Sequence, residues 1–277
     1  MTINIPQIIY GTAWKKEATT ELVIQAVQAG FRGIDTANQP KHYSENQVGK
    51  ALQELYKQGV SRKDLFLQTK FTPLNGQDHR IPYDPEADLH TQVMESFQSS
   101  LKNLGTDYID SYLLHGPNGH PGLDKSDFET WEAIEEIHES GKAKIIGVSN
   151  FNHMQLTTLL EKAKIKPMVV QNRCFARTGW DKLVRDICKQ HSILYEGFSL
   201  LTANPFVLEA SEVVKMAKEL NKTPEQIVFS FSIQIGMFPL TGTTSKKHLT
   251  QDLEAINLKL SQEQLNLVEY IYKTLKS

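Results

Sequence analysis

The chain has 277 residues, 40% of them hydrophobic, which is enough to bury the core of one large α/β domain. Its 30 basic and 32 acidic residues leave a formal net charge of −2, so it carries no electrostatic footprint for nucleic acid or for an anionic membrane. These values argue against both partners and favour a small molecule.

The two cysteines, Cys174 and Cys188, stand in neither a CxxC pair nor a zinc-ligand spacing, which favours a reducing, cytoplasmic location. The N-terminal segment lacks a basic region followed by an apolar one, and no apolar run approaches the roughly 20 residues of a membrane span. The nine histidines form neither an HxH at a strand end nor an HExxH on a helix. We therefore expect a cytoplasmic protein without a membrane span or a bound metal.

Short β-rich runs alternate with amphipathic helical patterns along the chain. In chain order, the expected strands are Gln7–Gly11, Gly33–Thr36, Leu65–Lys70, Tyr108–His115, Ala143–Ser149, Met168–Asn172, Ile193–Phe198 and Met237–Leu240. The helices expected between the first seven strands are Thr19–Ala29, Gln47–Gln58, Leu89–Leu104, Ser126–Ser140, Asn152–Lys164 and Trp180–Gln190. Two more, Glu209–Leu220 and Thr223–Ile235, precede the last strand, and Ser261–Leu275 follows it.

This strict alternation predicts a parallel sheet. Eight strand–helix units close naturally into a (β/α)8 TIM barrel, which we expect to form a single domain over residues 1–277. A doubly wound open sheet would show the same alternation and is the structural alternative, although no GxGxxG follows the first strand.

Four polar residues stand at or just after the ends of the second, third and fourth expected strands: Asp35, Tyr43, Lys70 and His115. Each by itself is compatible with an ordinary cap, a solvated charge or a packed side chain, but in a TIM barrel these strand ends meet at the active-site mouth. Reduction of a carbonyl by hydride leaves an alkoxide that needs a proton, and a nearby ammonium lowers the pKa of a phenol from about 10. Together the four residues predict that Tyr43 acts as an acid whose pKa is lowered by Lys70.

The segments Gly30–Ala37, Thr69–Lys70, Leu114–Pro117 and Ile146–Phe151 resemble, in order, successive signatures of the aldo-keto reductase family. The resemblance spans nearly the whole chain. It implies an alcohol:NADP+ oxidoreductase that reduces aldehydes or ketones with NADPH, and it favours a monomer. In this family pattern Tyr43 is the general acid, Lys70 and Asp35 tune it, and His115 polarises and orients the carbonyl.

The same resemblance implies the cofactor contacts. Ser149, Asn150 and Gln171 would hold the nicotinamide carboxamide, and Phe198 would stack under the ring where the family usually has a tyrosine. The backbone around Ser199 and Leu201 would meet the pyrophosphate. A helix N-terminus with flanking hydroxyls is a ready anion site. The resemblance implies that the adenosine 2′-phosphate binds at this one, at Thr243, Thr244, Ser245, Lys246 and His248.

The sequence departs from the family pattern at several points. The interval from Asp35 to Tyr43 is longer than usual, Gly116 replaces the common aromatic after the histidine, and Arg173 replaces the usual glutamate. The family's C-terminal loop over the substrate is missing from the sequence, so we expect a wide, open pocket. Its expected lining is Trp14, Phe71 and Asn118.

Two other classes compete with the reductase. The first is a non-catalytic nicotinamide-binding regulatory subunit on the same scaffold, against which the intact tetrad argues. The second is a metal-dependent barrel hydrolase, which the scattered histidines disfavour. The physiological carbonyl is left open, because loops of this fold serve many chemistries.

Overall fold

The computed structural model describes residues 5–118 and 121–276. Eight parallel strands close into a barrel in the order β1 to β8, and β1 pairs with both β2 and β8. The strands are β1 Ile9–Gly11, β2 Gly33–Asp35, β3 Phe66–Phe71, β4 Ile109–Leu114, β5 Ala143–Ser149, β6 Val169–Arg173, β7 Leu194–Phe198 and β8 Met237–Thr241. The expected TIM barrel is confirmed, and closure excludes the open doubly wound sheet.

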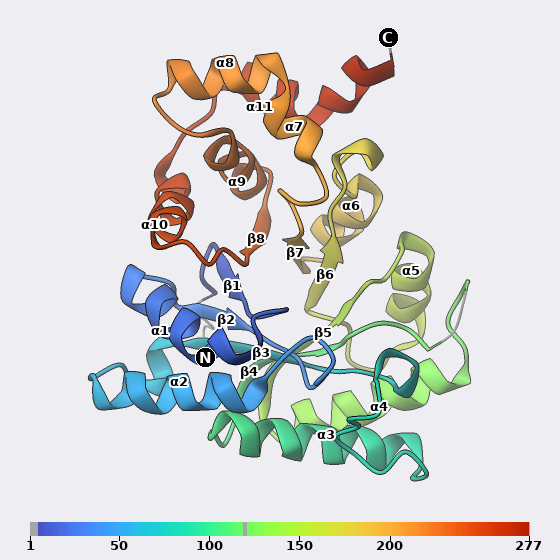
Figure 1. Cartoon of the computed structure of the whole chain (residues 1–277). Helices are drawn as coiled ribbons and strands as arrows, with labels where there is room; N and C mark the ends of the chain where they lie inside the picture. Colours follow the sequence, from blue (N-terminus) through green and yellow to red (C-terminus); the bar gives the residue numbers. More distant parts are fainter. Residues whose placement is uncertain (1–4, 119–120, 277) are drawn as a thin grey trace.

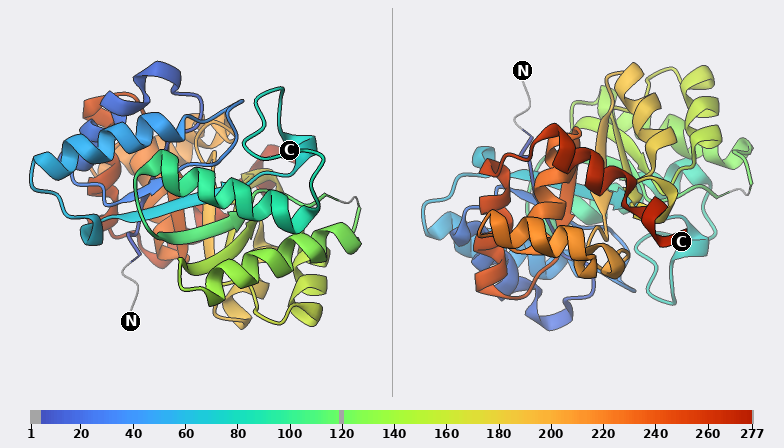
Figure 2. Two further views of the ribbon diagram at one scale, coloured as in Figure 1. Left: turned by 90° about the horizontal axis from the view of Figure 1, so that it is seen from below. Right: turned by 90° about the horizontal axis from the view of Figure 1, so that it is seen from above.

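The helices pack around the outside of the barrel (Figures 1 and 2), with α1, α2, α3 and α4 each beside the next. They are α1 Thr19–Ala29, α2 Glu45–Lys57, α3 Leu89–Leu104, α4 Lys125–Glu139, α5 His153–Lys162, α6 Lys182–Gln190, α7 Pro205–Glu209, α8 Ser211–Glu219, α9 Pro224–Gln234, α10 Lys246–Glu254 and α11 Gln262–Tyr270. Their ends follow local chemistry. The Asp88 carboxylate accepts the Thr91 N–H at the start of α3, and Gly105 closes it in the left-handed conformation.

Three helix predictions are wrong in detail. The predicted helix from Trp180 begins only at Lys182, because Trp180 and Asp181 have φ values of 59° and 57°, outside the helical region. The predicted helix Glu209–Leu220 covers α8, but it misses α7, a short helix with Pro205 in its first turn. The predicted last helix runs only to Tyr270 as α-helix and continues as a 3-10 segment.

Apolar side chains fill two regions, as a closed barrel requires. Inside it, Ile9, Phe66, Leu113, Ile145, Val169 and Leu240 form one buried cluster. A second, larger cluster lies between the sheet and the helices. Burial of each large apolar side chain stabilises the fold by roughly 1.5–3 kcal/mol, so the barrel is a packed core with the ligand site confined to one end.

Gly147 on β5 shows how tightly neighbouring strands approach. A Cβ built at this position would lie 2.2 Å from the Val169 carbonyl oxygen on β6. Any larger residue would force the two strands apart. In the same strand pair Ser149 is in register with Gln171, and both line the pocket described next.

Candidate active site

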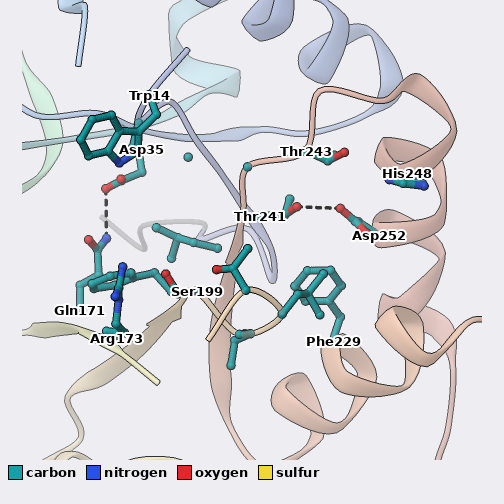
Figure 3. Close-up of a pocket in the computed structure, with 18 of the residues that line it drawn as sticks. Trp14, Asp35, Gln171, Arg173, Ser199, Phe229, Thr241, Thr243, His248 and Asp252 are labelled. Carbon is teal, nitrogen blue, oxygen red and sulfur yellow. Dashed lines mark hydrogen bonds between the residues drawn. The ribbon is translucent and has the colours of Figure 1, made fainter. Parts of the chain in front are cut away.

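A cavity of about 570 Å³ opens at the carboxyl ends of the strands. Its floor includes Asp35, Tyr43 and His115, and its walls come from the segments after β1, β6, β7 and β8. Figure 3 shows Asp35 and Gln171 facing each other on one side of the cavity and Thr243, His248 and Asp252 on the other. This volume lies in the range of pockets that hold small-molecule ligands, which are about 300–1,000 Å³.

Asp35 of this floor forms a buried ion pair with Lys70. Lys70 Nζ lies 2.6 Å from Asp35 Oδ1 and donates a second hydrogen bond, of 2.8 Å, to the Thr36 carbonyl oxygen. Burial is the largest single effect and would lower the pKa of Lys70, but Asp35, Tyr43 and Glu196 together outweigh burial and raise the pKa above its usual value. Lys70 therefore remains a cation although its side chain is 0% exposed.

Tyr43 lies against this cation, with its ring centroid 5.3 Å from Lys70 Nζ. Burial raises the pKa of Tyr43, the Lys70 ammonium lowers it, and Asp35 raises it, so that the net pKa lies above its usual value. Lys70 thus acts in the predicted direction, but desolvation is the larger effect. The phenol is protonated at neutral pH, as a proton donor must be.

His115 completes the group, with its ring centroid 5.9 Å from that of Tyr43. Its Nδ1 lies 2.7 Å from Thr72 Oγ1. Burial, together with the Lys70 charge, holds the pKa of His115 well below its usual value, so the imidazole is neutral. When the Thr72 hydroxyl donates to Nδ1, Nε2 carries the proton and can donate to an oxygen in the pocket.

The structure brings most of the predicted nicotinamide contacts together. Ser149, Gln171, Phe198, Ser199 and Leu201 all line the cavity. Asn150 is different, because its side-chain amide donates 2.8 Å to the His115 carbonyl oxygen and 3.2 Å to Ser149 Oγ. Its backbone has a left-handed φ of 60°. Through these two hydrogen bonds Asn150 links the end of β5 to the segment after β4.

Two of the five predicted phosphate contacts reach the described cavity wall, Thr243 and His248. Ser245 caps α10 by accepting the His248 N–H, and Thr244 and Lys246 are exposed beside it. The helix N-terminus is therefore formed as predicted, with Thr243 at the cavity wall. The backbone carbonyl oxygen of Thr243 accepts a 2.9 Å hydrogen bond from the Tyr10 hydroxyl.

The predicted substrate contacts are only partly supported. Trp14 lines the cavity, is 67% exposed, and stacks on His42 with 3.9 Å between ring centroids. Phe71 is fully buried and packs 5.5 Å from the Tyr83 ring, because it follows the inward-facing Lys70 and therefore points outward. Asn118 bonds to Asp127 through its backbone and to Thr130 through its amide. We therefore leave Phe71 and Asn118 out of the proposed substrate site.

Sequence patterns missed several residues at the pocket. Lys15 is 8% exposed and donates 2.6 Å to the Gly242 carbonyl oxygen, which ties the loop after β8 to the loop after β1. Burial lowers the pKa of Lys15 to about 8. Arg173, for which the sequence suggests no role, lines the wall with its guanidinium 5.8 Å from the Phe198 ring centroid. Its place at the end of a strand is the one feature that could have marked it.

Glu196 was also missed. It is 1% exposed on β7 and accepts hydrogen bonds from two buried glutamines. Burial raises its pKa to about 7, with Asp35 adding to the increase. A glutamate in the middle of a buried parallel strand is unusual, and that position was the available signal.

Comparison with known proteins identifies the chain's relatives. A model of the Aldo/keto reductase family matches residues 7–273. Dihydrodiol dehydrogenase 3 of Bos taurus is 30% identical over 96% of this chain and 87% of its own length. Glyoxal reductase of Bacillus subtilis is 32% identical over 92% of this chain and 83% of its own length.

Solved structures agree. MGS-M4, an aldo-keto reductase enzyme from a Medee basin deep-sea metagenome library, superposes with a TM-score of 0.83 at 30% identity, covering 97% of this chain and 92% of that chain. An aldo/keto reductase of Brucella melitensis gives a TM-score of 0.81 at 28% identity, covering 96% of this chain and 94% of that one. Fold and relatives together define a TIM-barrel oxidoreductase. The chain belongs to the aldo/keto reductase family.

Membrane-spanning helices and metal-binding clusters are both missing from the residues that the structure describes. In the described part of the chain, no helix combines the length and the apolar character needed to cross a bilayer. Across residues 5–118 and 121–276, no three histidine, cysteine, aspartate or glutamate side chains are grouped so as to hold a metal ion.

Proposed function

We propose that this protein reduces aldehydes or ketones to alcohols with NADPH. The observation that carries the proposal is the buried Lys70–Asp35 pair, 2.6 Å apart, next to a half-buried tyrosine and a neutral histidine that line the same cavity. A proton donor, a fixed cation and a neutral hydrogen-bond donor are the groups that carbonyl reduction needs.

Each of these side chains has a defined part. His115 Nε2 donates to the substrate carbonyl oxygen and orients it toward Tyr43. As negative charge develops on that oxygen, the Tyr43 hydroxyl gives it a proton, and the phenolate left behind is stabilised by the Lys70 ammonium. Asp35 holds that ammonium in place through its 2.6 Å contact. The bound nicotinamide supplies the hydride.

The residues of the cavity fit this cofactor. Gln171 presents an amide oxygen that accepts no hydrogen bond from the residues the structure describes, and Phe198 offers an aromatic ring beside it. The N-terminus of the nine-residue helix α10 lies at the far side of the cavity with Thr243 and His248. We assign the carboxamide to Ser149 and Gln171 and the adenosine phosphate to the α10 end.

The test is the loss of NADPH absorbance with a panel of aliphatic aldehydes, aromatic aldehydes and ketones, with NADH run in parallel. Glyoxal belongs in the panel because one relative is named a glyoxal reductase. We expect NADPH oxidation that depends on Tyr43, with bulky and small aldehydes both turned over by the open pocket. Cofactor binding without turnover of any carbonyl would instead favour the regulatory subunit.

The preference for NADPH over NADH should depend on Asp252. This side chain is 3% exposed, lines the same end of the cavity as His248, and accepts a 2.7 Å hydrogen bond from Thr241 Oγ1. Burial raises the pKa of Asp252 to about 6, so the group is charged at pH 7.5 and repels a 2′-phosphate there. We expect Asp252→Asn to raise the NADPH:NADH ratio of kcat/KM at pH 7.5 about fivefold, equivalent to about 1 kcal/mol.

The sign of the pH effect follows from the same raised pKa. As pH falls through about 6, Asp252 takes up a proton, so the wild-type ratio should rise and approach that of the Asn variant. NADH lacks the 2′-phosphate and serves as the internal control. Equal changes in kcat/KM for NADH and NADPH would show that Asp252 does not act through the phosphate.

A further inference from the structure

A second carboxylate lies under the cavity floor, opposite the catalytic one. Glu196 on β7 stands in register with Gln171 on β6, and Asp35 on β2 stands in register with Gln68 on β3. All four side chains point into the barrel and are at most 3% exposed. Two acids and two amides, from opposite sides of the barrel, therefore share one buried layer.

Four hydrogen bonds connect this layer. Gln68 Nε2 donates to Asp35 Oδ1 at 3.0 Å and to Glu196 Oε2 at 2.6 Å. Gln171 Nε2 donates to the same two oxygens at 3.0 and 2.7 Å. Since an amide nitrogen carries two protons, each glutamine gives one to each acid and has none left for a ligand.

The amide oxygens of the two glutamines have different surroundings. Gln68 Oε1 accepts a 2.6 Å hydrogen bond from Ser111 Oγ inside the barrel. Gln171 lines the cavity, and Figure 3 shows its nitrogen turned toward Asp35 and its oxygen turned away. Because no side chain in the described residues donates to that oxygen, Gln171 offers the cavity an acceptor.

We propose that Glu196 is a positioning residue that fixes the orientation of the Gln171 amide, so that the pocket recognises an N–H donor on its ligand. This inference rests on the proposed function, in which that ligand group is the nicotinamide carboxamide. Without the Glu196 acceptor, one Gln171 proton loses its partner in a buried site. Of the two bonds, the 3.0 Å bond to Asp35 is then left to favour the observed orientation, so rotation of the amide by half a turn costs less free energy than in the wild type. Glu196 thus acts through Gln171 and does not touch the ligand.

Glu196 orients the Gln171 amide by accepting its hydrogen bond, and the charge of Glu196 is not needed for this. The charged groups facing Glu196 are Asp35, which disfavours its ionisation, and Lys70, which favours it. A protonated carboxyl group still accepts a hydrogen bond through one oxygen. We therefore expect Glu196→Gln, which keeps an acceptor of the same length, to preserve recognition, and Glu196→Met, which has none, to weaken it.

The experiment compares the dissociation constants of NADPH and of its 3-acetylpyridine analogue, in which a methyl ketone replaces the carboxamide and removes the N–H donors. Wild-type protein should prefer NADPH by about 5- to 10-fold, the value of one hydrogen bond. Glu196→Gln should keep this ratio, and Glu196→Met should lower it toward one. Gln68→Met is the matched control, because it removes the equivalent two bonds without touching Gln171 and should keep the ratio.

Glu196→Asp provides a second variant should the methionine variant fail to fold, since it retracts the carboxylate by one methylene and should also lower the ratio. Retention of the wild-type ratio in both the Met and Asp variants would overturn the assignment of Glu196. A wild-type protein that binds NADPH and its analogue equally would overturn it as well. A wild-type protein that binds neither would instead refute the proposed function.

Discussion

Replacement of Tyr43 by phenylalanine should reduce kcat by about 10²- to 10⁴-fold, because the variant lacks the proton that the alkoxide requires. The phenylalanine ring keeps the contacts of the tyrosine with Lys70, at 5.3 Å, and with His115, at 5.9 Å. NADPH affinity should therefore change less than about twofold. The loss of activity would then be confined to the chemical step. Steady-state kinetics and cofactor fluorescence titration measure the two quantities.

Tyr56→Phe is the matched control for Tyr43→Phe. The Tyr56 hydroxyl is buried on α2 and has no hydrogen-bond partner among the described residues. Its removal should leave kcat and NADPH affinity unchanged. A Tyr43→Phe variant that retained wild-type kcat would move the acid role to another group at the pocket, such as His115.

Lys70→Met should reduce kcat by a similar factor and should also change its pH dependence. Lys70 lowers the pKa of Tyr43, so its loss raises that pKa further. The reaction needs a protonated tyrosine, and activity falls as pH rises through its pKa. The alkaline limb of the pH–rate profile should therefore move to higher pH, whereas an unmoved limb would contradict the coupling between these residues.

Stability must be separated from catalysis in this variant. Removing Lys70 leaves Asp35 as an uncompensated buried charge, at a cost of about 3–5 kcal/mol, or a fall in Tm on the order of 10 °C for a protein of this size. The double variant Asp35→Asn, Lys70→Met removes both charges and should recover most of that stability. It should remain inactive, because the tyrosine still lacks its cation.

The barrel and the meeting of Asp35, Lys70 and His115 at one end of it were predictable because their determinants are local. Buried parallel strands have short apolar runs, and helices between them have amphipathic patterns, so the eight strands were found within a few residues. Asp35, Lys70 and His115 stand at strand ends, and the topology of a TIM barrel brings such ends together. Tyr43 was assigned from its segment, and the structure places it against Lys70.

Sequence patterns did not predict side-chain direction, local backbone conformation or desolvation correctly at several residues. Phe71 follows Lys70 directly, and because neighbouring side chains of a strand point to opposite faces, both cannot face the pocket. The start of α6 was misplaced because the left-handed conformations of Trp180 and Asp181 have no clear mark in the sequence. The net pKa of Tyr43 was also beyond sequence reasoning, since desolvation depends on the surrounding fold.

By itself, the sequence determined the strand–helix order, the closed barrel as the expected fold, and the residue types at the strand ends, because these depend on neighbours along the chain. Only the tertiary structure decided which residues meet across the barrel. The bonds from Gln68 and Gln171 to Glu196 join residues separated by 128 and 25 positions, and they depend on strand register and barrel closure. Such contacts are set by packing geometry, which no single segment of the chain contains.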